Sequence, residues 1–156
     1  MVNFYQMHSH DASTVQKYKS MKKKVQVVIC LDAKDKNEVL LFKTNKKRGS
    51  FWQNITGGVD KGESFEDGAI REVFEESSIK VKESDLINLK MDFVFESQWG
   101  DTVTERCYAI KLKTKPEIKI DSKEHDEYKW VKVSEVTEEH FKFPSNFEAF
   151  QKAIQC

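Results

Sequence analysis

The segment from Gly57 to Ile79 constrains this chain more than any other, because it gathers five glutamates around a single arginine. Ser64 is a suitable helix N-cap, and Asp67 stands three residues later in a box-like position. We therefore predict a helix from Ser64 to about Ser77. Four apolar residues of this helix fall on one arc suited to a core: Ala69, Ile70, Val73 and Phe74.

The acidic stripe on this helix is formed by Glu72, Glu75 and Glu76, whose spacings of three and four place them on one side. We expect this arc to be separate from the apolar one. Arg71 can pair with one carboxylate, Glu75 at i+4, but it cannot neutralise all three. A divalent cation can, and carboxylate oxygens are the ligands that Mg²⁺ and Mn²⁺ prefer. The charge alone leaves a second interpretation open, a solvated acidic helix face.

The spacing of the segment is more specific than its charge. The fixed positions are, in order, Gly57, Glu63, Arg71, Glu72, Val73, Glu75, Glu76, Ser78 and Ile79. This pattern resembles the Nudix box at every position except the penultimate one, where the family usually has glycine and this chain has Ser78. A glycine there eases a left-handed helix cap. We therefore expect Ser78 to cost some local strain without touching any catalytic group.

The resemblance implies a Nudix hydrolase of the α+β class, an α/β/α sandwich with helices on both sides of a mixed β-sheet. Such enzymes hydrolyse a nucleoside diphosphate linked to another group by substitution at phosphorus. The implied cofactor is Mg²⁺, or Mn²⁺ in its place. The order of the expected elements, strands then helix then strands then helix, also fits a mixed sheet better than a doubly wound fold.

The resemblance assigns metal ligands residue by residue. It implies that Glu72 and Glu76 are the principal ligands. Glu75 would join them directly or through water, and a backbone carbonyl at Thr56 or Gly57 would complete the shell.

Two further residues of the box receive supporting roles from the resemblance. Arg71 would orient Glu72 or Glu75, and Glu63 would brace the loop before the helix. Carboxylates that bind a metal can also take a proton from the attacking water. The base varies within this family, so Glu72, Glu75 and a later glutamate, Glu124, all remain candidates.

The later candidate lies in the segment from Ser122 to Val133, an acidic, histidine-bearing loop ahead of a Trp-Val strand. Glu124 is the preferred additional ligand or base, and Glu127 is the fallback. We expect His125 to orient a phosphate or a carboxylate and not to act as a nucleophile. An exposed acidic loop is the alternative for each of these residues taken alone.

Four stretches outside the box resemble the bacterial dihydroneopterin triphosphate pyrophosphatase branch of the family. They are Gly49–Glu63, Val103–Leu112, Glu124–Val131 and Ser145–Phe150. This likeness implies that Phe51 and Trp52 flank a flat heterocycle and that Arg48, or a lysine near it, meets phosphates. The alternative for Trp52 is that it fills core beneath the box.

The rest of the chain predicts one domain preceded by an arm. Residues 1–20 are expected to be an N-terminal arm that holds His8 and His10, and residues 21–156 a single Nudix hydrolase domain. The segment Val133–Phe141 suggests a short helix, and Pro144–Ile154 an amphipathic helix capped by Ser145. The expected strands are Val25–Cys30, Glu38–Thr44, Leu86–Ser97, Thr104–Lys113 and Glu127–Val133, and Phe51–Thr56 is expected to be extended.

The composition limits the partners. The chain has 26 basic and 26 acidic residues, which disfavours a protein held to nucleic acid or to a membrane by bulk charge. Three unpaired-looking cysteines and the lack of a long apolar stretch predict a cytoplasmic protein. Cys30 and Cys107 lie in apolar runs and are expected to be small buried hydrophobic residues.

We expect a small nucleotide or pterin phosphate as substrate, such as dihydroneopterin triphosphate or a (d)NTP, and a monomer or homodimer. The alternatives are hydrolysis of an RNA 5′ end, of a dinucleoside polyphosphate or of an NDP-sugar. A non-catalytic Nudix-fold binding module is disfavoured, because such modules usually lose box glutamates and this chain keeps them.

Overall fold

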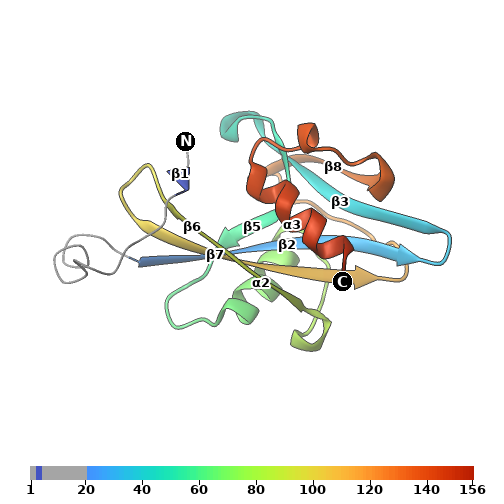
Figure 1. Cartoon of the computed structure of the whole chain (residues 1–156), viewed down its shortest axis with the longest axis horizontal. Helices are drawn as coiled ribbons and strands as arrows, with labels where there is room; N and C mark the ends of the chain where they lie inside the picture. Colours follow the sequence, from blue (N-terminus) through green and yellow to red (C-terminus); the bar gives the residue numbers. More distant parts are fainter. Residues whose placement is uncertain (1–2, 5–20) are drawn as a thin grey trace.

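The computed structural model describes residues 3–4 and 21–156 (Figure 1). The expected arm, with His8 and His10, therefore lies outside the described residues apart from Asn3–Phe4. That dipeptide forms a short strand, β1, whose backbone pairs with Phe95 and Glu96 at the edge of the sheet.

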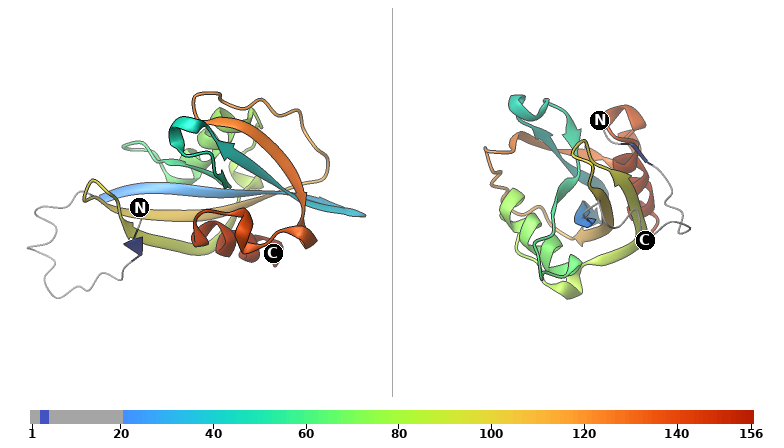
Figure 2. Two further views of the ribbon diagram at one scale, coloured as in Figure 1. Left: turned by 90° about the horizontal axis from the view of Figure 1, so that it is seen from above. Right: turned by 90° about the vertical axis from the view of Figure 1, so that its left-hand side faces the viewer.

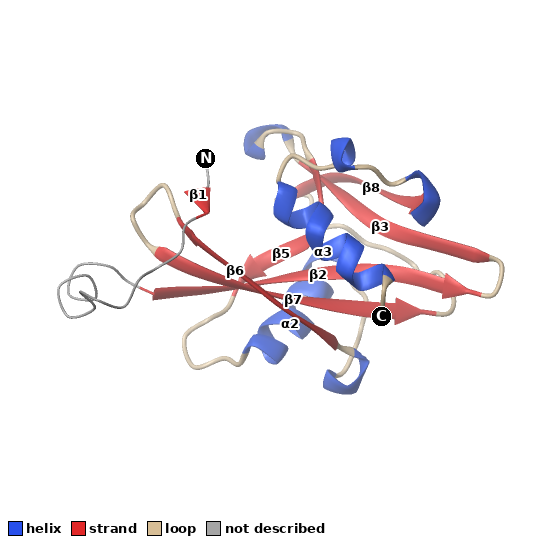
Figure 3. Cartoon of the chain, in the orientation of Figure 1, coloured by secondary structure: helices blue, strands red, loops and turns tan. Residues whose placement is uncertain are grey.

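The described residues form a mixed sheet with two α-helices and several short 3-10 helices (Figure 3). The strands are β1 (Asn3–Phe4), β2 (Met21–Ala33), β3 (Lys36–Thr44), β4 (Trp52–Gln53), β5 (Ile55–Gly58), β6 (Ile87–Glu96), β7 (Thr102–Leu112) and β8 (His125–Lys132). The α-helices are α2 (Phe65–Ser77) and α3 (Pro144–Ile154). The 3-10 helices are η2 (Lys46–Arg48), η3 (Glu83–Asp85), η4 (Val133–Glu135) and η5 (Glu138–His140).

Strand β2 organises the sheet. One of its edges pairs with β7 in parallel from Met21 to Leu31, and β7 pairs in turn with β6. Its other edge is divided between β3, with which it forms an antiparallel hairpin, and β5. Strand β3 pairs with β8 along its other edge, and beyond its pairing with β2 it pairs with β4 at Phe42 and Lys43. The sheet therefore forks where β2 and β3 part, and β4 and β5 line the two sides of the fork.

The two α-helices cover opposite faces of the sheet, as Figure 2 shows, so the α+β sandwich with helices on both sides is confirmed. The face under α3 holds a core that includes Val28, Cys30, Leu41, Cys107, Ala149 and Phe150. The face under α2 holds a core that includes Val27, Ile29, Phe42, Ile55, Ala69 and Val73. Cys30 and Cys107 are buried as predicted.

The burial of α2 differs from the expectation of separate apolar and acidic arcs. Ala69 and Val73 are fully buried, but Phe74 is 47% exposed and Ile70 is only half-buried. The side facing the sheet runs instead through Glu72 and Glu76, which lie within one or two turns of the buried alanine and valine. Two of the three acidic residues thus belong to the buried side of the helix.

The C-terminal helix also differs in detail. It begins at Pro144, and its N-cap is Phe143, so the prediction that Ser145 caps it was wrong. Proline suits the first position of a helix because that position needs no hydrogen-bonded N–H. The short helix expected over Val133–Phe141 is present as the 3-10 helices η4 and η5.

Within residues 3–4 and 21–156, no helix combines the length and the apolar character that crossing a membrane requires.

Candidate active site

The loop before α2 is fixed by hydrogen bonds that its own sequence supplies. The Ser64 hydroxyl accepts the backbone N–H of Asp67 at 3.0 Å, which makes Ser64 the N-cap as predicted. The Glu63 carboxylate accepts the backbone N–H of Asp60 at 2.9 Å. The start of the helix is therefore held in one position relative to the loop.

Arg71 is the centre of the charged network. Its guanidinium donates two hydrogen bonds of 2.9 Å to the two carboxylate oxygens of Glu63. It donates further to Glu72 at 2.8 Å, to Glu75 at 3.2 Å and to the carbonyl of Gly58 at 2.7 Å. One planar side chain thus joins the loop to the helix and fixes one oxygen of each of two box glutamates.

The Arg71–Glu63 pair also determines the charge state of Glu63. The hydrogen bonds from Arg71, and then the one from the Asp60 N–H, lower the pKa of the Glu63 carboxyl to about 2. The same pair raises the pKa of Arg71. Both groups are therefore ionised at neutral pH.

Glu72 lies directly against the backbone of Gly57. A Cβ atom on Gly57 would stand 2.0 Å from the Glu72 Cδ, so no larger residue fits without moving this carboxylate. Burial raises the pKa of Glu72, and the hydrogen bond from Arg71 acts in the opposite direction. The glycine of the box is required here for close approach.

Glu76 is buried beside His125. The Oε2 atom of Glu76 and the Nδ1 atom of His125 lie 2.6 Å apart, and both side chains are 2% exposed. Gln53 Nε2 lies 3.2 Å from the other ring nitrogen, Nε2 of His125. Burial lowers the pKa of His125, which favours the neutral ring. A Gln53 amide that donates to Nε2 places the ring hydrogen on Nδ1, but Nδ1 and the Glu76 oxygen lack the geometry of a hydrogen bond in this structure.

Gln53 was not identified from the sequence, where it stood only as the third residue of an extended stretch. It reaches His125 because β4 and β8 pair with opposite edges of β3 at Phe42–Thr44. The resemblance assigned Phe51 and Trp52 to a heterocycle but gave Gln53 no role. Nothing local to Gln53 indicates a partner 72 residues away.

Glu124 brings a second carboxylate to this place. One ligand atom from each of Glu76, Glu124 and His125 lies within 4.8 Å of the others. Glu124 is half-buried, and its Oε1 atom accepts a hydrogen bond of 2.8 Å from Arg48. Glu127, the fallback candidate, is exposed and pairs with Lys43 at 3.1 Å.

This donor set fits a divalent cation. Within the described part of the chain, the buried Glu76 Oε2 and His125 Nδ1 have no hydrogen-bond partner beyond their mutual contact. A buried carboxylate without a cationic neighbour is costly, and a cation would offset that cost. Two carboxylates and an imidazole are ligands of hard and borderline divalent metals.

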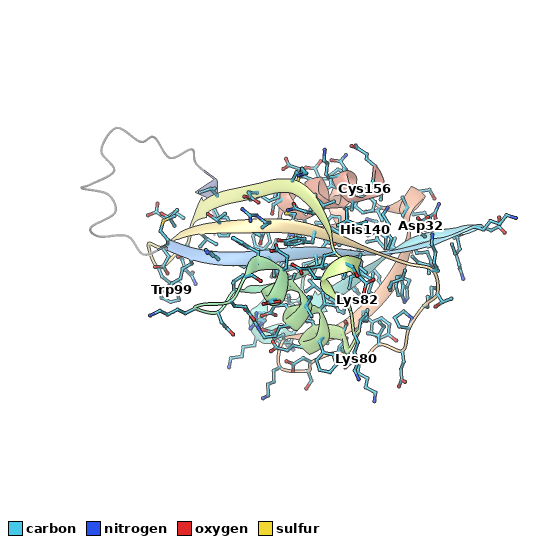
Figure 4. All side chains as sticks on the ribbon, turned by 90° about the horizontal axis from the view of Figure 1, so that it is seen from below. Asp32, Lys80, Lys82, Trp99, His140 and Cys156 are labelled. Atoms are coloured by element: carbon cyan, nitrogen blue, oxygen red, sulfur yellow. The ribbon has the colours of Figure 1, made fainter. Side chains whose placement is uncertain are left out.

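The remaining residues lie in several parts of the fold. Phe51 packs edge-on against Phe143, with ring centroids 5.4 Å apart. Trp52 is half-buried against the core under α3, and the Lys129 ammonium lies 4.1 Å from its ring centroid. Thr56 and Gly57 are half-buried in β5. His140 lies on the α3 side of the molecule, away from α2 (Figure 4), where its ring accepts the Thr137 N–H at 3.0 Å.

A model of the NUDIX domain matches residues 21–152. The chain belongs to the NUDIX family. The matched range includes the loop and helix that Arg71 joins. Because relatives within the family include pyrophosphohydrolases, the chain is a Nudix hydrolase.

Three relatives are similar in sequence to this Nudix chain. An octanoyltransferase from Myxococcus xanthus is 33% identical over 95 residues, 61% of this chain and 26% of that protein. An RNA pyrophosphohydrolase from Pelagibacter ubique (strain HTCC1062) is 32% identical over 114 residues, 65% of this chain and 72% of that protein. The dihydroneopterin triphosphate diphosphatase of Escherichia coli (strain K12) is 31% identical over 126 residues, 74% of this chain and 82% of that protein.

A solved structure agrees with the last of these relatives. The structure of the E. coli dihydroneopterin triphosphate pyrophosphohydrolase matches this Nudix domain with a TM-score of 0.71 and 29% identity. The match covers 88% of this chain and 100% of the E. coli chain. The expected resemblance to that branch of the family is confirmed.

Proposed function

We propose that this Nudix hydrolase is a Mg²⁺-dependent pyrophosphohydrolase that cleaves a nucleoside or pterin triphosphate by attack of water at phosphorus. The main support is the group formed by Glu76, Glu124 and His125 beside the glutamates that Arg71 orients. The likeness to a dihydroneopterin triphosphate diphosphatase supports the substrate class.

The glutamates of α2 would hold the cation. Glu72 and Glu76 are its proposed principal ligands, Glu75 would join them directly or through water, and a carbonyl of Thr56 or Gly57 would complete the shell. When bound, the cation neutralises phosphate oxygens and makes a water more acidic. The hydrogen bonds from Arg71 leave Glu72 and Glu75 one oxygen each for this purpose.

The proton of the attacking water would pass to a carboxylate. Glu124 is the preferred base, because it lies at the edge of the group and is half-buried, so water can reach it. Arg48 holds one of its oxygens and leaves the other available. Glu72 and Glu75 remain alternative bases, and His125 would position Glu76 instead of attacking phosphorus.

A second candidate activity is hydrolysis of a triphosphorylated RNA 5′ end, favoured by the likeness to an RNA pyrophosphohydrolase. The balance of 26 basic and 26 acidic residues gives no general attraction for a long polyanion. We therefore place a small triphosphate first.

A substrate panel tests the proposal. The purified chain is incubated with dihydroneopterin triphosphate, the four dNTPs and a 5′-triphosphorylated RNA, with Mg²⁺ or with EDTA. We expect release of pyrophosphate from a small triphosphate in Mg²⁺ alone. Release of orthophosphate only, or no turnover of any substrate, would contradict the proposal. Faster release from the RNA would favour the second candidate.

A further inference from the structure

A cavity lies on the α3 face of the sheet, at the N-terminal end of α3. The residues of its lining that matter here are Gln53, Thr56, Phe95, Glu105, Phe143 and Asn146. They come from both sides of the fork, from β6 and β7, and from the segment that begins α3. The cavity is therefore lined by segments that are distant in the sequence.

Glu105 is the most unusual member of this lining. It is 4% exposed, on a strand whose neighbouring inward positions are apolar. Its Oε1 atom accepts a hydrogen bond of 2.9 Å from Gln26, and its Oε2 atom lies 3.9 Å from the Lys24 ammonium. Burial raises the pKa of Glu105, while Lys24 and Gln26 act in the opposite direction. A buried carboxylate with one oxygen so weakly paired is costly unless something else donates to it.

A buried amide network fixes the orientation of this carboxylate. Gln26, which donates to Glu105, accepts from the Asn54 side chain at 2.8 Å. The backbone N–H of Asn54 donates in turn to the Asn146 side chain at 2.8 Å. Gln26 and Asn54 are fully buried. Because its hydrogen-bond partner is held on both sides, the carboxylate is pre-oriented toward the cavity.

The rest of the lining suits a flat ring. Phe95 and Phe143 contribute aromatic surface from two different elements, and the Lys24 ammonium lies 6.0 Å from the Phe95 ring centroid. Asn146 adds an amide at the start of α3. Aromatic walls with a few placed polar groups are typical of pockets for heterocycles.

The cavity is also next to the proposed cation site. Gln53 lines the cavity and contacts His125, which contacts Glu76. Thr56 lines the cavity and precedes Gly57, against which Glu72 lies. A ring in the cavity would therefore place its phosphate chain toward the acidic face of α2.

We propose that this cavity binds the heterocycle of the substrate and that Glu105 selects a ring with two adjacent N–H donors, the amino-oxo edge shared by guanine and pterin. This inference rests on the proposed function and specifies its substrate class. An ionised carboxylate offers only acceptors, so it matches a ring N–H beside an exocyclic amino group. Adenine presents one donor beside one acceptor, and hypoxanthine lacks the amino group.

The experiment compares kcat/KM for dGTP, dITP and dATP in Mg²⁺. We expect dGTP to exceed dITP by about 10-fold and dATP by about 100-fold, since each charge-assisted hydrogen bond lost is worth that order. Glu105→Gln should reduce the preference for dGTP over dITP to about 3-fold or less. Glu38→Gln is the matched control, because Glu38 is also a buried strand glutamate paired with a lysine, Lys115 at 2.8 Å.

A binding measurement separates this inference from the proposed function. Titration calorimetry with GMP, IMP and AMP in EDTA requires no turnover, and GMP should bind most tightly to the wild-type chain. Hydrolysis of triphosphates with equal kcat/KM for the three bases would overturn the role of Glu105 and leave the proposed function standing. A preference for dATP would also overturn the role of Glu105. Adenine presents a donor beside an acceptor, which matches a neutral carboxyl and not a carboxylate. Tighter binding of GMP than of IMP and AMP, without hydrolysis of any triphosphate, would overturn the proposed function and leave the role of Glu105 standing.

Discussion

The two helices that cover the sheet bury opposite kinds of side chain. Helix α2 leaves Phe74 47% exposed and buries Glu76 to 1%. Helix α3 buries Phe150 to 2% and Ala149 and Ala153 completely. By hydrophobicity alone, α3 is oriented as expected and α2 is not.

The difference indicates which helix carries candidate site residues and which one mainly packs against the core. On α3 the buried side chains gain free energy by leaving water. On α2 two glutamates face the sheet at a cost, and the hydrogen bond from Arg71 offsets part of it for Glu72. We infer that α3 mainly stabilises the domain, while α2 positions candidate site residues at a cost in stability. The predictions below test this contrast.

The largest effect is expected for Glu76→Gln. The amide cannot replace a charged ligand, so turnover of a small triphosphate should fall by roughly 1,000-fold, equivalent to about 4 kcal/mol of transition-state stabilisation. The thermal midpoint should fall little or rise. Glu148→Gln, an exposed glutamate on α3, is the control and should retain activity. Near-normal turnover of Glu76→Gln would remove Glu76 from the ligands.

Phe150→Ala is the converse change on α3. It removes a ring packed near Phe141 and Phe147, with centroids 6.4 and 6.1 Å away, and should lower the free energy of unfolding by about 3–5 kcal/mol. Activity per folded molecule should change little. Urea denaturation followed by circular dichroism, with kinetics well below the midpoint, measures both. A large loss of kcat in the folded fraction would break the division of roles between the helices.

Glu63→Gln should change how stability depends on pH. The folded pKa of Glu63 is about 2, below its usual value of 4.5, so this carboxylate stabilises the fold above about pH 4.5. That contribution is lost as pH falls from 4.5 toward 2. The variant lacks it, and its urea midpoint should therefore fall less steeply over this range. Asp67→Asn, one turn away, is a suitable comparison. Parallel curves for wild type and Glu63→Gln would contradict the role of the Arg71 pair.

The smallest effect is expected for Ser78→Gly. Ser78 ends α2 at φ 65°, a left-handed conformation that glycine adopts without cost, and the predicted strain is therefore present. The substitution should raise the free energy of unfolding by about 0.5–1 kcal/mol and leave turnover unchanged. Ser78→Ala keeps the Cβ atom and should give no such gain. Equal effects of the two changes would show that the Ser78 hydroxyl, 3.4 Å from the Lys119 carbonyl, is what matters.

The loop and start of α2 could be predicted from the sequence because their determinants are local. Ser64 caps the helix three residues from its partner, and Arg71 lies within eight residues of the three glutamates to which it donates hydrogen bonds. The sequence did not show which side of α2 faces the sheet. Helical spacing gives the angles between side chains, but the side that meets the sheet depends on contacts elsewhere in the chain.

Gln53 and Glu105 show what local reasoning misses. Gln53 meets His125 only because β3 pairs with both of their strands. Glu105 lies in a stretch that predicts an ordinary strand, and its burial follows from Gln26 on the parallel neighbour β2, 79 residues away. Both positions depend on strand pairing between distant segments, which periodicity within one segment does not reveal.

The fork of the sheet has a consequence for how the domain opens. Strand β2 contributes Val25, Val27 and Ile29 to the core under α2, and Val28 and Cys30 to the core under α3. It also pairs along both edges, with β7 on one side and with β3 and β5 on the other. The two sides of the sheet cannot separate without breaking the hydrogen bonds that β2 makes along its edges. Its amide protons should therefore exchange with deuterium only through cooperative unfolding of the whole domain, while those of the exposed turn at Trp99 exchange locally (Figure 4).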